Sequence, residues 1–134
     1  MLDLFRLLVV VFLVMHGIGH IIWFLAAWTP IKAGVGDGAW ILPGDVTISS
    51  PVGKLWGLLA LMVVVLFLSA AAGLVLQATW WGSATRFGVF LSFAVVVPWL
   101  RQSPRATGIN AIVADLILMF LLALPLSVEL TGII

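Results

Sequence analysis

Long runs of apolar residues, separated by short polar stretches, dominate the chain. Four runs occur, at about residues 4–28, 51–76, 81–100 and 108–127. Each is close to the roughly 20 residues that a helix needs to cross the hydrocarbon core of a bilayer. We therefore predict an all-α membrane protein, a single transmembrane domain over residues 1–134 whose four helices form an up-down-up-down bundle.

Turn-forming residues mark the boundary between the first two runs. Thr29-Pro30 closes the first run, and Ser50-Pro51 supplies an N-cap and a proline at the first helical position of the second. The connection 29–50 contains several glycines and two apolar patches. Loops of this length are usually either functional or disordered. We expect an ordered loop that lies over one end of the bundle, rather than a flexible linker.

The first apolar run contains two histidines, in the segment His16-Gly17-Ile18-Gly19-His20. At about 100° per residue, both histidines and both glycines fall on one side of a helix. Polar groups at membrane depth usually face the protein interior and often carry its function. This segment is therefore the first candidate for a functional site.

Asp115 lies inside the fourth run, at a depth similar to that of the histidines. If the helices alternate in direction, His20 and Asp115 lie about 12 Å and about 9 Å from the same end, at 1.5 Å per residue. An isolated carboxylate at this depth costs on the order of 2.5–3.5 kcal/mol, so we expect Asp115 to pair with a histidine. Such a pair either locks two helices together or takes part in chemistry, and the sequence leaves both readings open.

Further polar residues collect at the same end of the predicted bundle and complete a pocket. This pocket either binds a ligand or locks helices together. Its predicted residues are His16, His20, Asp115, Asn110, Lys54 and Arg101. Ser92, the polar residue inside the third run, is expected to bond to the backbone of its own helix, as serines in membrane helices commonly do.

Composition narrows the chemistry. The chain is 64% hydrophobic and 8% charged, whereas about a quarter of the residues in soluble domains are charged. A net charge of +1 gives no reason to expect a nucleic-acid partner. The absence of cysteine from the sequence removes dithiol, disulfide and thiolate–metal chemistry.

The spacing of the two histidines also raises the question of a metal. Two histidines one helical turn apart suit zinc or copper, but zinc needs at least three protein ligands and Asp115 is the only candidate third. We therefore expect no structural metal. Two haem ligands cannot come from adjacent turns of one helix, but a single histidine remains a candidate ligand for a tetrapyrrole.

The first helix carries a resemblance to a known family. Arg6, an apolar run and the His16 to His20 segment, followed by three more helices, resemble the DoxX-like group of small four-helix membrane proteins. That family is associated with quinone-linked sulfur oxidation and with accessory roles beside redox enzymes. The resemblance implies quinone handling, and it transfers no catalytic residue to this chain.

Two classes of function fit these features. The one we favour is a non-catalytic accessory subunit of a larger membrane complex, such as an electron-transport assembly, whose pocket holds a lipid, quinone or pigment. Its partners would be the bilayer and other membrane subunits or further copies of itself. The alternative is a small membrane enzyme or carrier, in which Asp115 and a histidine move protons for a hydrophobic substrate. We expect a bacterial inner-membrane protein, and its lysine and arginine distribution leaves the orientation open.

Overall fold

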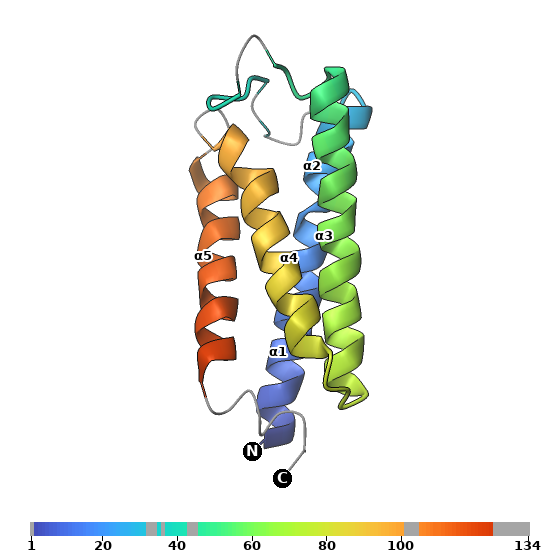
Figure 1. Cartoon of the computed structure of the whole chain (residues 1–134), viewed down its shortest axis with the longest axis vertical. Coiled ribbons are helices and arrows are strands. Elements are labelled where there is room, and N and C mark those ends of the chain that lie inside the picture. Colours follow the sequence, from blue (N-terminus) through green and yellow to red (C-terminus); the bar gives the residue numbers. More distant parts are fainter. Residues whose placement is uncertain (1, 32–34, 36, 43–45, 101–104, 125–134) are drawn as a thin grey trace.

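The chain folds into an elongated bundle of helices (Figure 1). The structure is a computed structural model that describes residues 2–31, 35, 37–42, 46–100 and 105–124. Its elements are α1 (Leu2–Gly19), α2 (Ile21–Trp28), α3 (Pro51–Val75), α4 (Trp81–Val96), the short 3-10 helix η1 (Val97–Trp99) and α5 (Arg105–Ala123). The prediction of an all-α fold is confirmed for these residues.

Three helical segments are long and apolar enough to cross a membrane: Leu4–Trp28, Pro51–Val75 and Trp81–Trp99. The apolar part of α5, Gly108–Ala123, is shorter. The prediction of a fourth crossing helix that extends to residue 127 is therefore met only in part, because residues 125–134 lie outside the described part of the chain. The membrane character that these segments indicate agrees with the sequence.

The first predicted helix is not continuous, because it breaks at His20 into α1 and α2. The backbone N–H of His20 donates to the carbonyl of Gly17, three residues back, at 3.0 Å. A regular α-helix would pair this N–H with the carbonyl of His16, four residues back. That carbonyl instead accepts a hydrogen bond from Nδ1 of the His20 ring at 3.0 Å. A side chain inserted into the helical ladder thus causes the break and at the same time orients the ring.

α3 packs against α1, α2 and α4, whereas α5 packs against α4, which lies between α3 and α5 in Figure 1. Small residues allow this close approach. A Cβ atom added at Gly17 of α1 would lie 2.9 Å from Cβ of Phe67, and one added at Gly88 of α4 would lie 3.0 Å from the Phe67 ring. Phe67 of α3 therefore fills the space that the glycines of two neighbouring helices leave open.

Two tryptophans satisfy the carbonyls at the end of α4, where Pro98 interrupts the helix. Proline has no N–H, so the carbonyl of Ala94, four residues earlier, loses its helical donor. Nε1 of Trp56 in α3 donates to this carbonyl at 3.0 Å. Trp40, in the loop after α2, donates from Nε1 to the Val97 carbonyl at 2.7 Å and from its backbone N–H to the Pro98 carbonyl at 2.9 Å.

The connection between α2 and α3 is described in part. Gly38 and Thr47 form one isolated antiparallel bridge, and Ile48 is buried. A Cβ atom at Gly53 would collide with the backbone carbonyl of Ile48, which shows how closely the end of this connection approaches α3. Residues 32–34, 36 and 43–45 lie outside the described part, so the order of the whole loop stays a prediction.

Candidate functional site

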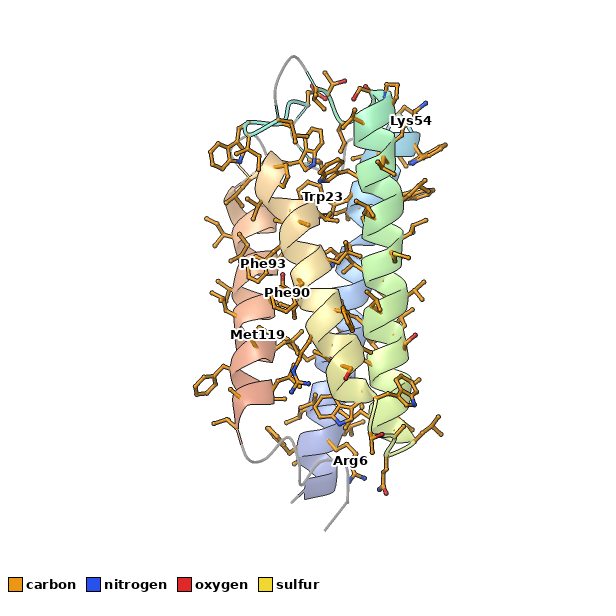
Figure 2. All side chains as sticks on the ribbon, in the orientation of Figure 1. Arg6, Trp23, Lys54, Phe90, Phe93 and Met119 are labelled. Carbon is orange, nitrogen blue, oxygen red and sulfur yellow. The ribbon has the colours of Figure 1, made fainter. Side chains whose placement is uncertain are left out.

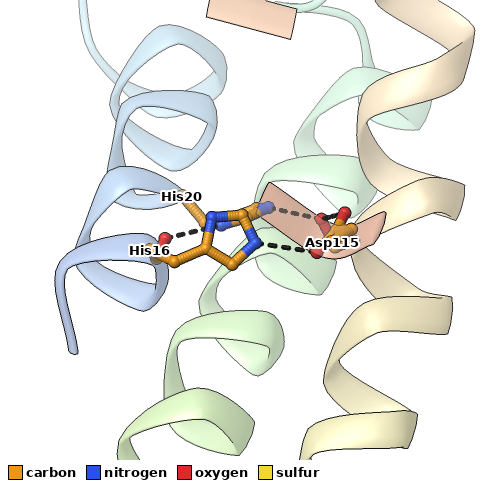
Figure 3. Close-up of polar contacts among 4 residues, drawn as sticks. His16, His20 and Asp115 are labelled. Atoms are coloured by element: carbon orange, nitrogen blue, oxygen red, sulfur yellow. Dashed lines mark hydrogen bonds and ion pairs between the residues drawn. The ribbon is translucent and has the colours of Figure 1, made fainter. Parts of the chain in front are cut away.

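Four side chains form one hydrogen-bonded network that joins the α1–α2 segment to α4 and α5. Nε2 of His16 lies 2.7 Å from Oδ1 of Asp115, as Figure 3 shows. The hydroxyl oxygen of Ser92 lies 2.6 Å from the other carboxyl oxygen, Oδ2. Nε2 of His20 lies 2.8 Å from the same hydroxyl oxygen. The network therefore runs from His20 through Ser92 and Asp115 to His16.

This network is shielded from the surroundings. Asp115 and Ser92 are 0% exposed, His20 is 2% exposed, and the side chain of His16 is 7% exposed. The Phe67 ring covers the network, with ring centroids 4.8 Å from His16 and 6.1 Å from His20. In such surroundings a hydrogen bond is strong and an unpaired polar group is costly. Each of the three hydrogen bonds between these side chains, and the bond from His20 to the His16 carbonyl, therefore needs a hydrogen between its two atoms.

The backbone carbonyl at one end of the network fixes the position of one hydrogen. The His16 carbonyl can only accept, so Nδ1 of His20 must carry a hydrogen. If Ser92 donates to Asp115, then Nε2 of His20 must donate to Ser92, and His20 is an imidazolium that faces an ionised Asp115. If His20 is neutral, Ser92 must donate to Nε2 of His20, and Asp115 must be protonated on the oxygen that faces Ser92.

These two arrangements contain the same number of protons and have a net charge of zero. They differ only in the position of two hydrogens on either side of Ser92. An ionised Asp115 with two neutral histidines would leave no hydrogen between His20 and Ser92, so two lone pairs would face each other at 2.8 Å. A further proton on the network would give it a net positive charge. A neutral network therefore satisfies every contact at the lowest cost for a group buried in an apolar bundle.

The neutral network leaves one ring nitrogen unused. In both arrangements Nε2 of His16 donates to Asp115, so Nδ1 of His16 has a lone pair and no hydrogen. The other three histidine ring nitrogens are hydrogen-bonded. Nδ1 of His16 makes no hydrogen bond within the part of the chain that the structure describes. It is the group of the network that remains able to contact a ligand.

A cavity of about 320 Å³ lies beside this network, between the α1–α2 segment and α5. The residues that line it include Met15, His16, Gly19, His20, Trp23 and Asn110. Met15, Gly19 and Asn110 are exposed, so the cavity opens on the outer face of the bundle. A Cβ atom at Gly19 would meet no atom within 4 Å. Gly19 thus borders the open space, whereas Gly17, two residues earlier, is tightly packed.

A second, smaller cavity of about 190 Å³ also lies between α1 and α5, closer to the start of α1. Its lining is entirely apolar and consists of Leu8, Val9, Phe12, Ile117, Leu118 and Leu121. By position along both helices, the hydrogen bond between His16 and Asp115 lies between the two cavities. The polar and apolar spaces along this pair of helices are therefore separated by the network.

The structure brings together four of the six predicted pocket residues. His16, His20 and Asp115 belong to the network, and Asn110 lines the cavity. Lys54 does not line the cavity: its Nζ lies 5.4 Å from the ring centroid of Trp28. Figure 2 shows Lys54 at the end of the bundle. Arg101 lies outside the described residues.

The expectation for Ser92 is wrong. Its hydroxyl joins His20 to Asp115 and does not bond to the backbone of its own helix. The packed helices bring His20 and Asp115 within hydrogen-bonding distance of the hydroxyl, whereas a helical carbonyl already has a donor, which explains this choice. The only signal in the sequence was the position of Ser92 as a lone polar residue inside an apolar run.

Within the described ranges, no group of three or more His, Cys, Asp or Glu side chains is placed to hold a metal ion. The two histidine rings meet edge to face, with centroids 4.9 Å apart. Nδ1 of His16 is the ring nitrogen that would remain for a tetrapyrrole metal.

Comparisons with known proteins assign no family to this site. The chain matches no protein-family model, no curated protein and no solved structure. The resemblance to the DoxX-like group stays a prediction from the first-helix segment.

Proposed function

We propose that this small membrane protein holds a hydrophobic ligand by its head group in the cavity between the α1–α2 segment and α5. We further propose that it does so as a non-catalytic accessory subunit of a larger membrane complex, with a lipid, quinone or pigment as the ligand. The observation that carries the proposal is an open cavity of about 320 Å³ whose wall includes both histidines of the buried network.

A purely structural role accounts for the network but leaves the cavity unexplained. A hydrogen bond that only locks helices together needs no open space beside it, and a gap between helices lacks the packing contacts that would also hold them together. Gly19 lines the cavity, and a Cβ atom there would meet no atom within 4 Å, so a larger side chain has room at this position. Ligand pockets commonly measure roughly 300–1,000 Å³ and combine apolar walls with a few polar groups. The cavity has both properties.

The arrangement of Asp115 gives it a positioning role. Both of its oxygens are hydrogen-bonded and the residue is fully buried, so it does not reach the cavity itself. Its contribution is to fix the ring of His16. This is the role of a positioning group for a residue that faces the ligand.

The alternative of a small membrane enzyme or carrier has one supporting observation. The Asp115–His16 pair has the form of a carboxylate that orients a histidine whose other nitrogen lies free, as in a general base. This alternative differs from the first in requiring a hydrophobic substrate that is chemically changed or transported. Turnover by the purified protein, lost on replacement of His16, would support it over the accessory role.

The proposal is tested by identifying the small molecules and polypeptides that co-purify with the protein. Wild-type protein is purified gently from native membranes, and its lipid extract and partner polypeptides are analysed by mass spectrometry. Gly19→Leu should fill the cavity, whereas Ile18→Leu at the neighbouring exposed position should not. We expect a near-stoichiometric small molecule with the wild type and Ile18→Leu, and its loss from Gly19→Leu.

Two results would contradict the proposal. If Gly19→Leu retains the same molecules in the same amounts, the cavity does not hold the ligand. If the protein is isolated with no stoichiometric partner polypeptide, it is not a stably bound accessory subunit.

A further inference from the structure

We infer that the cavity selects ligands whose head group donates a hydrogen bond, such as an alcohol or a phenol, over ligands whose head group only accepts, such as an ether, ester or ketone. The inference deepens the proposed function and rests on it. It follows from the position of Nδ1 of His16, an acceptor without a donor among the described residues, on a residue that lines the cavity.

The ring of His16 is held in place by its neighbours. Nε2 is bound to Asp115, the ring stacks on Phe12 with centroids 6.2 Å apart, and it contacts Phe67 at 4.8 Å. His20 meets it edge to face at 4.9 Å. Turning the ring over would break the hydrogen bond to Asp115. Nδ1 therefore keeps a fixed position with respect to the cavity.

The polarity of Nδ1 is set by the rest of the network. A hydrogen on Nδ1 appears only when the fully bonded network gains a proton and becomes positively charged. With His16 and Asp115 buried among apolar helices, that charge is unfavourable. A ligand that donates to Nδ1 leaves the network neutral. A ligand that only accepts would place its own lone pair against that of Nδ1.

The other polar side chain of the wall does not impose a polarity. Asn110 is exposed at the mouth of the cavity and offers both a carbonyl acceptor and an amide donor. It can therefore adapt to either kind of head group. His16 therefore determines whether the cavity prefers head groups that donate or head groups that accept a hydrogen bond.

The size of the cavity indicates what part of the ligand enters it. A volume of about 320 Å³ is at the low end of the range for small-molecule sites, roughly 300–1,000 Å³. It accommodates a ring-sized head group and leaves a long tail outside. The tail would leave past Met15 and Gly19 onto the apolar outer face of the bundle. The expected ligand is thus an amphiphile with a hydroxyl-bearing head.

A matched pair of probes tests the inference. 4-Hexylphenol and 4-hexylanisole share a ring and a tail, and differ in that a methyl group replaces the phenolic hydrogen. Each is titrated into the protein in lipid nanodiscs, with concentrations expressed as mole fraction in the lipid so that partitioning cancels. Tryptophan fluorescence reports binding, because Trp23 lines the cavity. We expect the phenol to bind about three- to tenfold more tightly, the range that one net hydrogen bond supplies.

Three variants test whether the preference for the phenol arises at the cavity and at His16. Gly19→Leu should abolish binding of both probes, and Ile18→Leu should leave both unchanged. His16→Phe should keep the cavity and remove the preference for the phenol. If His16→Phe does not fold, the comparison of the two probes on wild type and Gly19→Leu still decides the question.

The outcomes separate the inference from the proposed function. Equal binding of both probes, or tighter binding of the anisole, with loss of both in Gly19→Leu, would overturn the preference for donors while leaving the cavity as a binding site. Failure of both probes to bind, or binding that Gly19→Leu does not change, would overturn the proposed ligand site itself.

Discussion

The α1–α2 segment contacts its neighbours in two different ways. Toward α3 it packs through small residues: a Cβ atom at Gly17 would lie 2.9 Å from Cβ of Phe67, and one at Gly57 would lie 2.7 Å from Cβ of Ala27. Toward α5 there is little close backbone contact, two cavities lie between the helices, and the His16–Asp115 hydrogen bond spans the gap.

The comparison shows how a small bundle can be tightly assembled and still keep open space. Helices surrounded by lipid gain little from the hydrophobic effect, so they associate through close packing or through polar bonds. The α3 side uses close packing, and a ligand there would have to displace side chains. On the α5 side, the hydrogen bond between His16 and Asp115 holds α5 in place without requiring contact along the length of the helix. A ligand site is therefore expected on the α5 side.

Replacement of Asp115 should have the largest effect, because it removes the polar bond on the α5 side. Asp115→Leu leaves the hydrogen-bonding groups of His16 and Ser92 without their partner, and we expect a loss of about 2–4 kcal/mol of unfolding free energy. Asp115→Asn should cost less than about 1 kcal/mol, since its carbonyl can accept from His16 while its amide donates to Ser92. Reversible unfolding in mixed micelles measures both variants.

The asparagine variant also distinguishes the two neutral arrangements. It reproduces the hydrogen positions of the form in which Asp115 is protonated and His20 is neutral. If Asp115→Asn is as damaging as Asp115→Leu, the native network depends on an ionised Asp115 beside an imidazolium.

Alanine at the two glycines of α1 compares the two sides directly. At Gly17 the new methyl group would meet Cβ of Phe67, which cannot rotate away, so we expect Gly17→Ala to cost about 1–3 kcal/mol. At Gly19 the methyl group meets open space. Gly19→Ala should therefore be neutral or stabilise the protein by up to about 1 kcal/mol, because alanine favours a helix over glycine. Equal losses at both positions would contradict the contrast between the two sides.

A smaller effect is expected at the end of α4, where α3 supplies a missing donor. Trp56→Phe removes the indole that serves the Ala94 carbonyl and should cost about 1 kcal/mol. Pro98→Ala restores a backbone N–H at the position that would normally serve this carbonyl. Measured as a double-mutant cycle, the loss from Trp56→Phe should shrink when residue 98 is alanine. Additive effects would show that the indole hydrogen bond and the missing N–H are unrelated.

The pattern of apolar runs was sufficient to predict the helical fold and the common depth of the key polar residues. Depth is a one-dimensional property, because the rise per residue along a helix is constant. It placed His16, His20 and Asp115 near one another, and it also placed Lys54 at the same end. Depth does not say which side of the bundle a residue faces. Lys54, on α3, lies over the Trp28 ring and does not line the cavity.

The break at His20 and the role of Ser92 could not be predicted from the same pattern. Both depend on hydrogen bonds between groups whose partners are fixed only after the helices pack. The His16 carbonyl has two candidate donors on one residue, the N–H and the ring of His20, and the structure selects the ring. Ser92 meets its partners only because α4 turns it toward Asp115. Propensity and periodicity contain no information on either choice.

The ¹⁵N spectrum of the two histidine rings, recorded on the wild-type protein in lipid, tests the central claim most directly. The chain has only two histidines, so four ring nitrogens account for the whole spectrum. The account predicts a hydrogen on Nε2 and none on Nδ1 of His16, together with a hydrogen on Nδ1 of His20. A hydrogen on Nδ1 of His16 in the absence of ligand would contradict the neutral network, and with it the acceptor that the cavity is proposed to offer.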